Sequence, residues 1–219
     1  MNIFTKNNKK NKSKRSWVAN HQNDFFVKKA KENNYRSRAS YKLIEINDKY
    51  HLIKDHQKIL DVGCSPGGWC QVLKQWQCKI WAMDILPMKP LDGVNFQLMD
   101  INQTTVWKDF YCNLVGLNEF DVIVSDAAWN TSGHQNIDHL RTSSLNTMVI
   151  NQLIFLLKPK GHWIFKTFNG SETPNIIKYL KNHFDKVHTF KPQSSKSQSP
   201  EIYIISIGFK FNITEEFIL

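Results

Sequence analysis

The sequence predicts an α/β fold: a mostly parallel seven-stranded sheet, helices on both of its faces, and an antiparallel hairpin at the C-terminal end. From residue 58 onward, short apolar runs alternate with stretches of helical character. The apolar runs are continuous rather than alternating, which is typical of strands buried on both faces of a parallel sheet. Only a polar loop, residues 191–200, separates the last two runs. A loop without a helix cannot provide a parallel crossover, so these two strands are expected to form a hairpin.

Two helices are expected between Asn20 and about Tyr50, where apolar residues recur among charged ones. Ser37 or Ser40 could cap the second of them. Further helices are expected over residues 69–76, 138–157 and 174–184, and residues 158–161 should end the longest one. The seven expected strands cover residues 58–63, 79–85, 94–101, 120–127, 162–168, 187–190 and 202–211.

Length and composition indicate one ordinary globular domain. The chain has 219 residues, of which 41% are apolar and 22% charged. This composition excludes a disordered chain, a collagen-like chain and a disulfide scaffold. No apolar run reaches the roughly 18 residues of a membrane helix. We expect a single domain over residues 21–212, a flexible basic arm over residues 1–20 and a short tail over residues 213–219.

The charge balance points to a polyanionic partner. Lys and Arg total 29 against 19 acidic residues, which gives a net charge of +10. Nucleic acid or an anionic membrane surface are the usual partners, while solubility or a coding bias toward Lys, Asn and Ile would also explain the charge. The first 23 residues are basic, contain no acid and lack an apolar segment, so no secretory signal is predicted. We expect a cytoplasmic protein of bacterial type, with an organelle matrix as the alternative.

The cysteines predict no metal site. The four are Cys64, Cys70, Cys78 and Cys112, and no two of them form a C-x-x-C pair or a paired cluster with histidines. They are therefore expected to be reduced thiols, as in a cytosol-like compartment. Cys64 lies beside a glycine-rich turn and is interpreted as a packing residue.

A glycine-rich turn follows the first strand, with the sequence Asp-Val-Gly-Cys-Ser-Pro-Gly-Gly-Trp over residues 61–69. Such a turn lets a ligand approach the backbone closely and presents free amides at a helix start. Its spacing is not the dinucleotide G-x-G-x-x-G, which counts against NAD. Asp84 ends the second strand, where a carboxylate can accept both hydroxyls of an adenosine ribose, although turn aspartates are common. Together the two features predict an adenosine-containing cofactor.

Further polar residues are expected at the same edge of the sheet. Asp100 and Asp126 follow the third and fourth strands, and ligands bind at the carboxyl ends of strands in such folds. Lys166 lies inside the strongly apolar run Trp-Ile-Phe-Lys-Thr-Phe. A lysine is almost never fully buried unless it is paired, so it either snorkels at the strand end or faces a catalytic cleft. Desolvation makes a neutral lysine amine, able to act as a base, accessible near neutral pH.

The order and spacing of several fragments carry a family resemblance. They are Tyr-Arg-Ser-Arg-Ala-Ser-Tyr-Lys-Leu at 35–43, Ser-Pro-Gly-Gly-Trp at 65–69, Asp-Ile-Leu-Pro-Met at 84–88, Lys-Pro at 191–192 and Ser-Pro-Glu-Ile-Tyr-Ile at 199–204. On these, the chain from about Ser16 to Lys210 resembles the RrmJ/FtsJ-like ribosomal RNA 2′-O-methyltransferases, of the bacterial type that methylates a uridine ribose in 23S rRNA. Two positions depart from the family: Trp129 replaces a proline, and the turn has Cys64-Ser65 where small alanines are common.

The resemblance implies a Rossmann-like, S-adenosyl-L-methionine-dependent methyltransferase. It carries the catalytic roles of the family's Lys-Asp-Lys-Glu set over to Lys42, Asp126, Lys166 and Glu201. It carries the cofactor contacts over to Gly67, Trp69, Asp84, Asp100 and Asp126. It also implies ribosomal RNA as the partner, within the large subunit, and a monomer that needs no metal and no membrane.

From the resemblance we expect Lys166 to take the proton of a ribose 2′-hydroxyl, with Asp126 holding Lys166. Lys42 and Glu201 would orient the ribose. The basic arm and four further basic residues, Arg36, Arg38, Lys191 and Lys196, would grip phosphates. Trp129 is a candidate for stacking on a base, although simple packing explains it better. Three alternatives stay open: a tRNA or mRNA-cap 2′-O-methyltransferase, a non-catalytic ribosome assembly factor, and NAD-linked redox chemistry, which the glycine spacing disfavours.

Overall fold

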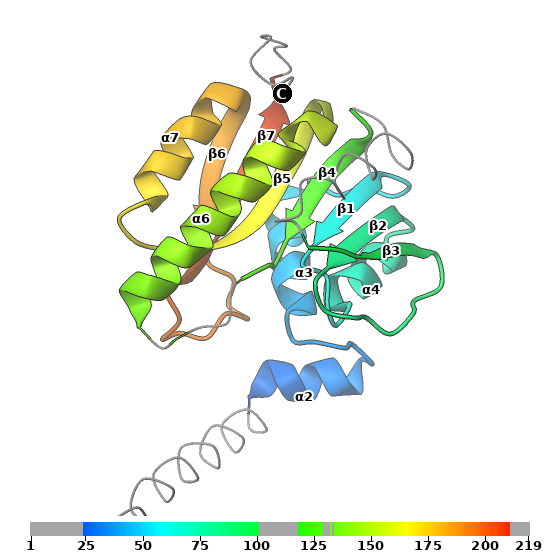
Figure 1. Cartoon of the computed structure of the whole chain (residues 1–219). Coiled ribbons are helices and arrows are strands. Elements are labelled where there is room, and N and C mark those ends of the chain that lie inside the picture. The colour runs from blue at the N-terminus through cyan, green and yellow to red at the C-terminus, as the bar shows by residue number, and fades with distance from the viewer. Residues whose placement is uncertain (1–23, 101–117, 129–131, 133, 211–219) are drawn as a thin grey trace, which may run out of the picture.

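The computed structural model describes residues 24–100, 118–128, 132 and 134–210. These residues build one seven-stranded sheet between two helical layers (Figure 1). Its strand order is β3-β2-β1-β4-β5-β7-β6. The predicted arm, the predicted tail, Trp129 and Cys112 lie outside the described residues.

The strands confirm the predicted α/β class and the predicted hairpin. Strands β1 to β5 run parallel to one another. Strand β7 is antiparallel to both of its neighbours, β5 and β6. Their bounds are β1 Lys58–Val62, β2 Lys79–Asp84, β3 Val94–Leu98, β4 Phe120–Ser125, β5 Leu157–Phe168, β6 Phe184–Phe190 and β7 Glu201–Phe209. The hairpin partner β7 therefore inserts between β5 and β6, a placement that the order of the runs along the chain did not predict.

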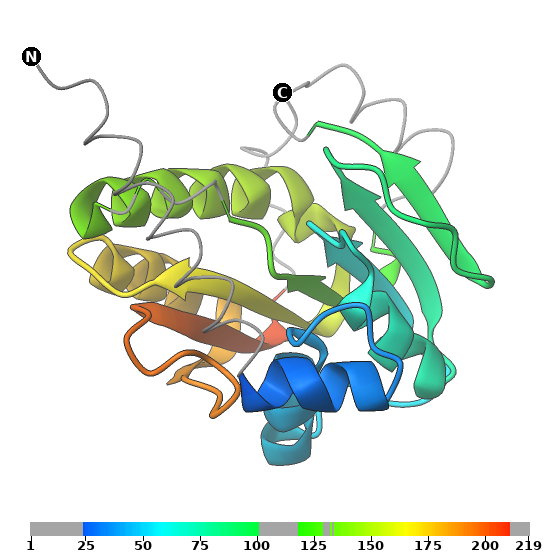
Figure 2. The ribbon, with the colours of Figure 1, turned by 90° about the horizontal axis from the view of Figure 1, so that it is seen from below.

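Helices cover both faces of the sheet (Figure 2). The helices are α2 Phe25–Glu32, α3 Ser40–Tyr50, α4 Gly68–Gln75, α6 Gln135–Leu153 and α7 Thr173–His183, and the 3₁₀ turn η2 spans Ile154–Leu156. One buried cluster joins α6 and α7 to one face of the sheet, and a second joins α3 and α4 to the other. Neighbouring strand residues alternate between the clusters, as Ile123 and Val124 do, because successive side chains point to opposite faces. No helix in the described part of the chain is long and apolar enough to cross a bilayer.

Several element boundaries differ from the sequence prediction, and the most informative difference lies between the long helix and β5. The long helix ends at Leu153, and residues 158–161 belong to β5 instead of ending the helix. The register between β4 and β5 is irregular there, because Phe120 pairs with Leu157 but Val122 pairs with His162. Four residues, three more than in a regular register, thus oppose Asp121, whose carboxylate accepts from Lys158 Nζ at 2.8 Å. Residues 158–161 form an irregular part of β5. Their content of lysine, proline and glycine did not distinguish this irregularity from a helix end.

The predicted serine cap of α3 is wrong. Ala39 is the N-cap residue and has no side-chain cap, while Ser40 is already helical. The Ser40 hydroxyl donates to the Gly68 carbonyl at 3.0 Å, and the Ser37 hydroxyl accepts from the Ala39 amide at 3.1 Å. Both serines instead help to join the start of α3 to the glycine-rich turn before α4.

Candidate functional site

A pocket of about 320 Å³ lies at the carboxyl ends of the strands. The three aspartates predicted at strand ends, Asp84, Asp100 and Asp126, all line it. Apolar side chains complete the lining, among them Met83, Ile85, Leu86, Met99, Leu145 and Val149. Ile85 and Leu86 are more than half exposed, which is unusual for large apolar side chains. A flat apolar ligand bound in the pocket would cover them.

The carboxylate of Asp84 organises the backbone around this pocket. One of its oxygens accepts from the Ser65 amide and the other from the Leu86 amide, each at 2.8 Å. Asp84 therefore joins the glycine-rich turn after β1 to the loop after β2. Its predicted role toward the ribose of a cofactor is compatible with its place in the pocket lining and stays a prediction.

Gly67 and Trp69 do not line the pocket. Trp69 is 3% exposed, donates its indole N–H to the Ala39 carbonyl at 2.7 Å, and packs near the Tyr203 ring. Gly67 has φ of 105°, and a Cβ there would come within 2.7 Å of the Arg36 guanidinium. Both residues therefore hold the turn in shape from outside the pocket, and their predicted cofactor contacts stay untested.

Gly63 is the glycine of the turn that borders the pocket, and the sequence analysis did not single it out. It has φ of +73°, and a Cβ built on it would lie 2.5 Å from the Cβ of Ala127. The missing side chain therefore lets the turn after β1 approach the segment after β4. A signal was present, because Gly63 is the first glycine after the β1 strand run.

Gly63→Ala is expected to weaken cofactor binding by at least tenfold and to destabilise the fold by more than about 1 kcal/mol. The alanine would have to adopt a left-handed backbone conformation and also displace the Ala127 backbone. Isothermal titration with cofactor and a urea unfolding curve would measure the two effects. Gly93→Ala is the matched control, because its φ is also positive but no atom lies within 4 Å of the added Cβ. Equal loss of cofactor affinity in both variants would contradict the clash.

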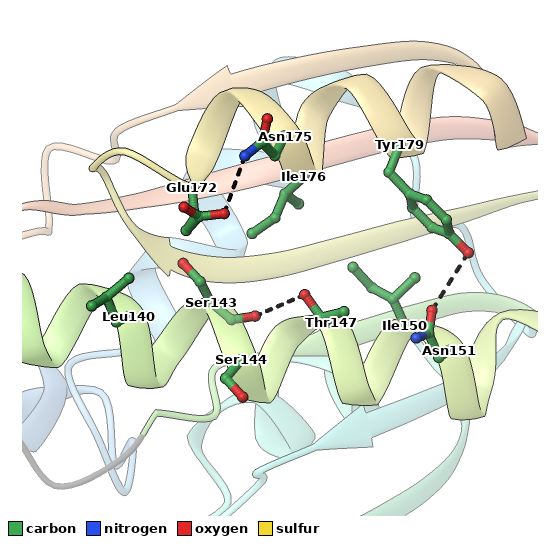
Figure 3. Close-up of a pocket in the computed structure, with 10 residues that line it drawn as sticks. All are labelled: Leu140, Ser143, Ser144, Thr147, Ile150, Asn151, Glu172, Asn175, Ile176 and Tyr179. Atoms are coloured by element: carbon green, nitrogen blue, oxygen red, sulfur yellow. Dashed lines mark hydrogen bonds between the residues drawn. The ribbon is translucent and has the colours of Figure 1, made fainter.

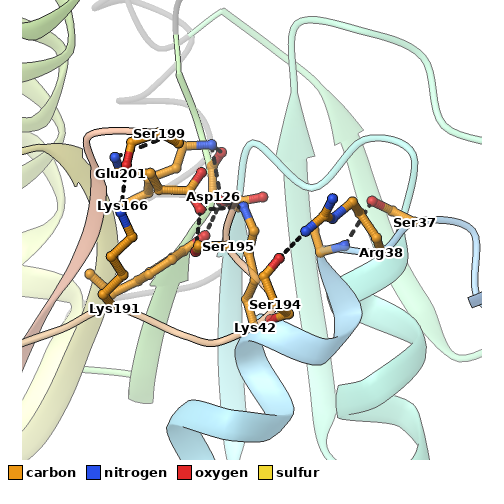
Figure 4. A network of polar contacts seen from close by, with 12 residues as sticks. Ser37, Arg38, Lys42, Asp126, Lys166, Lys191, Ser194, Ser195, Ser199 and Glu201 are labelled. Atoms are coloured by element: carbon orange, nitrogen blue, oxygen red, sulfur yellow. Dashed lines mark hydrogen bonds and ion pairs between the residues drawn. The ribbon is translucent and has the colours of Figure 1, made fainter. Parts of the chain in front are cut away.

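The four residues of the predicted catalytic set meet beside this pocket (Figure 4). Lys166 Nζ lies 3.0 Å and Lys42 Nζ 3.9 Å from Oδ1 of Asp126. Lys42 Nζ also lies 2.7 Å from Oε1 of Glu201. The four side chains come from α3, the end of β4, β5 and the start of β7, and both lysines and the glutamate are 8% exposed. The structure therefore joins residues that are up to 159 positions apart into one ion-pair network.

Backbone contacts fix Lys166 more tightly than its ion pair alone. Its Nζ donates to the Asp126 carbonyl at 2.5 Å, in addition to the carboxylate contact. The Asn146 amide on α6 donates to the Lys166 carbonyl at 3.0 Å. The lysine is thus buried and paired, and the alternative of snorkelling at a strand end is wrong.

Asp126 is held as a carboxylate. Burial alone would raise its pKa, but the ammonium groups of Lys166 and Lys42 and the hydroxyl of Tyr203 outweigh that effect and lower the pKa below its ordinary value. Asp126 also lines the pocket, so it connects the cofactor pocket to the two lysines.

Tyr203 is a member of the network that the sequence analysis missed. Its ring is fully buried, and its hydroxyl donates to Oδ1 of Asp126 at 2.6 Å. Burial, followed by the charges of Asp126 and Glu201, raises the pKa of Tyr203 well above 10, so the group remains an O–H donor. The sequence could have indicated this residue. Side chains two positions apart in a strand lie on the same face of the sheet, and Tyr203 follows Glu201 by two residues.

Three of the basic residues predicted to grip phosphates make contacts within the protein, and their predicted phosphate contacts stay a prediction. Arg36 donates to the carbonyls of Pro66, Lys89 and Pro90. Arg38 forms an ion pair with Asp24 and donates to the Ser194 carbonyl. Lys191 Nζ donates to the carbonyls of Ser197 and Ser199 within its own loop. Net charge indicated a polyanionic partner, but it could not show which basic side chains donate hydrogen bonds to backbone carbonyls of the protein.

The loop over residues 191–200 is attached to α3 and supports Glu201. The Glu45 carboxylate accepts from the backbone amides of Gln193 and Ser194. The Ser195 hydroxyl donates to Oε1 of Glu201 at 2.7 Å, the same oxygen that Lys42 contacts. The loop therefore orients one carboxylate of the network.

Asp61 on β1 is a buried acid outside this network. It is 1% exposed, and its Oδ2 accepts from the Cys70 thiol at 3.0 Å. Burial raises the pKa of Asp61 to about 7, and the charges of Asp126 and Asp84 add to this effect. Cys64, Cys70 and Cys78 are free and buried, as expected for packing thiols, and no group of three or more possible metal ligands occurs in the described ranges.

A second hollow, of about 440 Å³, lies between α6 and α7 (Figure 3). Leu140, Ile150, Ile176 and Tyr179 provide its apolar lining. None of the predicted catalytic or cofactor residues borders it. Asp84, Asp100 and Asp126 line the pocket at the strand ends and do not border this hollow.

Comparison with known proteins identifies the family. The sequence profile of the FtsJ-like methyltransferases matches residues 35–209. A relative from Bartonella bacilliformis named ribosomal RNA large subunit methyltransferase E is 41% identical over 90% of this chain and 84% of its own. A relative of the same name from Marinobacter nauticus is 40% identical over 92% of this chain and 98% of its own.

Solved structures agree with the fold. A ribosomal RNA methyltransferase from Plasmodium falciparum has a TM-score of 0.68 and 35% identity, and the match covers 80% of this chain and 98% of that one. The 1,6-didemethyltoxoflavin-N1-methyltransferase of Burkholderia thailandensis, crystallised with S-adenosylhomocysteine, has a TM-score of 0.57 at 14% identity over 90% of each chain. That second likeness concerns the fold alone.

The pocket fits S-adenosyl-L-methionine by the chemistry of its lining. Asp84 is a carboxylate of the kind that accepts from ribose hydroxyls, and Ile85 and Leu86 are exposed apolar side chains of the kind that cover a purine. Asp126 stands between this lining and the lysines. The chain belongs to the FtsJ-like methyltransferase family and uses S-adenosyl-L-methionine as its methyl donor.

Proposed function

We propose that the protein methylates a ribose 2′-hydroxyl, on a uridine of large-subunit 23S-type ribosomal RNA, with Lys166 as the general base. The observation that carries this proposal is the buried Lys166–Asp126 pair directly beside the cofactor pocket. The names of the relatives, ribosomal RNA large subunit methyltransferase E, support the choice of acceptor. We further propose a cytoplasmic monomer acting on the large subunit.

The reaction requires little covalent chemistry from the protein. When bound, S-adenosyl-L-methionine supplies a methyl group on a sulfonium, which is already activated for transfer to an oxygen nucleophile. Catalysis therefore comes mostly from positioning the hydroxyl and accepting its proton. Lys166 is the proposed acceptor of that proton, and the Asp126 carboxylate, 3.0 Å from Nζ, holds the side chain in place beside the pocket.

The other members of the network place the ribose. Lys42 presents its ammonium between Asp126 and Glu201 and can donate to a ribose oxygen. Glu201, which accepts from the Ser195 hydroxyl, supplies a second carboxylate acceptor for Lys42 besides that of Asp126. Tyr203 keeps one donor directed at Asp126, so the carboxylate does not rotate away from Lys166.

The test uses labelled S-adenosyl-L-methionine and large ribosomal subunits from a strain that lacks the modification. Alkali cannot cleave RNA next to a blocked 2′-oxygen, so label in an alkali-resistant dinucleotide demonstrates ribose methylation. Free rRNA, tRNA and capped RNA are assayed in parallel. Label on tRNA or capped RNA alone would overturn the rRNA assignment, and no transfer to any RNA with cofactor bound would indicate a non-catalytic assembly factor.

A further inference from the structure

Helix α2 lies at the edge of the sheet where the strands carry their carboxyl ends (Figures 1 and 2). Arg38 fixes it there, because its guanidinium pairs with Asp24, the N-cap of α2, and stands over the Phe26 ring. The same guanidinium donates to the Ser194 carbonyl in the loop that supports the catalytic set. Helix α2 is thereby held in a fixed relation to Lys42, which follows Arg38 by four residues.

A second set of contacts fixes the other end of α2. The Asn33 amide donates to the Tyr41 hydroxyl at 2.9 Å, and that hydroxyl donates to the Lys29 carbonyl at 3.0 Å. Val27 and Ala30 are buried against the body of the protein. The opposite face of α2 is therefore presented to solvent in a defined orientation.

That outer face combines an aromatic ring with positive charge. Phe25 is 67% exposed, the largest value among the exposed large apolar side chains of the described residues. Lys28 and Lys29 follow at helical spacings of three and four and are both exposed, so they lie on the same face as Phe25, together with Glu32. Lys29 Nζ lies 6.0 Å from the Phe25 centroid and 4.8 Å from the Tyr41 centroid. The helix carries three lysines and one glutamate. An exposed ring beside ammonium groups suits a partner with flat faces and regularly spaced negative charges, which describes unpaired RNA.

We propose that Phe25, Lys28 and Lys29 form a docking surface for an unpaired stretch of the acceptor RNA. The Phe25 ring stacks on one base, and the two ammonium groups hold the neighbouring phosphates. This inference rests on the proposed function for its RNA acceptor, and it assigns a binding role to residues outside the catalytic network. Arg36, Arg38 and Lys191, for which phosphate contacts were predicted, already donate to backbone carbonyls, so they are not part of this surface.

The stacking contact is tested by fluorescence anisotropy with a fluorescein-labelled single-stranded RNA of about 20 nucleotides and its blunt duplex. Phe25→Leu keeps apolar bulk but removes the π face, so we expect single-strand affinity to fall about tenfold, the effect of losing one base–aromatic stack. Phe25→Trp should retain or improve affinity. Duplex affinity should change in neither variant. Thermal unfolding should also be unchanged, because the ring is mostly in solvent.

The phosphate contacts are tested by salt titration. Lys28→Gln should reduce the slope of log affinity against log salt by about 0.7, the value for one phosphate contact on single-stranded nucleic acid. Lys178→Gln removes an exposed lysine from α7 and serves as the matched control, with no change of slope expected. A full slope in Lys28→Gln would overturn the assignment of that lysine.

Binding and methylation are measured on the same variants, which separates this inference from the proposed function. Loss of single-strand binding in Phe25→Leu supports the docking surface even if wild-type protein methylates none of the RNAs. Unchanged RNA binding in Phe25→Leu overturns it. Unchanged binding of RNA together with slower methylation of assembled subunits would assign α2 to a ribosomal protein and would also overturn it.

Discussion

Lys166→Met is expected to lower methyl transfer by about a hundredfold to ten-thousandfold, the usual contribution of a positioned general base. The long unbranched side chain preserves packing in β5 but supplies no proton acceptor. Lys166 does not border the cofactor pocket, so affinity for S-adenosyl-L-methionine should stay within about twofold of wild type. Single-turnover methylation and isothermal titration measure these two quantities.

Lys166→Arg separates proton transfer from charge. Arginine preserves a cation beside Asp126 but does not lose its proton in proteins, so it can hold the carboxylate without acting as a base. We expect this variant to be as inactive as Lys166→Met. Lys160→Met, which removes an exposed lysine of the same strand, should retain full activity. Substantial turnover by Lys166→Arg would reject Lys166 as the base and leave it an electrostatic role.

Stability should fall between about pH 4 and pH 7 because of Asp61. Its pKa is about 7 in the folded protein and near 3.8 in the unfolded chain, so over this range the folded state holds a proton that the unfolded state has released. Unfolding then becomes easier as pH rises. The favourable contribution is complete below the unfolded pKa and is lost once pH reaches the folded pKa, a change of about 4 kcal/mol over the interval.

Asp61→Asn removes this titration while keeping the shape of the side chain. The unfolding free energy of the variant relative to wild type should therefore rise steadily from pH 4 to pH 7 and become constant above it. Urea unfolding at five or six pH values gives the difference directly. Asp55→Asn, at an exposed position, provides the control. A difference curve for Asp61→Asn that is flat across this range would show that Asp61 is ionised in the native protein.

The sequence predicted the structural features that depend on residues close together in the chain. Continuous apolar runs located the strands, and the runs placed Asp84, Asp100 and Asp126 together because parallel strands end at one edge. The family resemblance supplied the catalytic set, which the structure then brings together. The position of β7 was not predictable, because its pairing with both β5 and β6 is decided by long-range contacts.

The side-chain contacts that the sequence did not predict share one physical cause. A guanidinium or an indole can be satisfied by a backbone carbonyl, and the partner becomes known only when the chain is folded. Arg38 and Arg36 serve carbonyls in distant loops, and Trp69 serves that of Ala39. Similarly, residue type identified a glycine-rich turn, but only the approach of Ala127 shows that Gly63 cannot carry a side chain.

The late position of β7 in the chain has a consequence for biosynthesis. Glu201 and Tyr203 both lie on this strand, and within the described sheet β6 pairs with β7 alone. A nascent polypeptide that has emerged only as far as β6 therefore lacks both residues, and its β6 has no strand to pair with. It also lacks Ile204 and Ile205, which complete the two buried clusters. The sheet and the proposed catalytic network should therefore be completed in the same late step of synthesis.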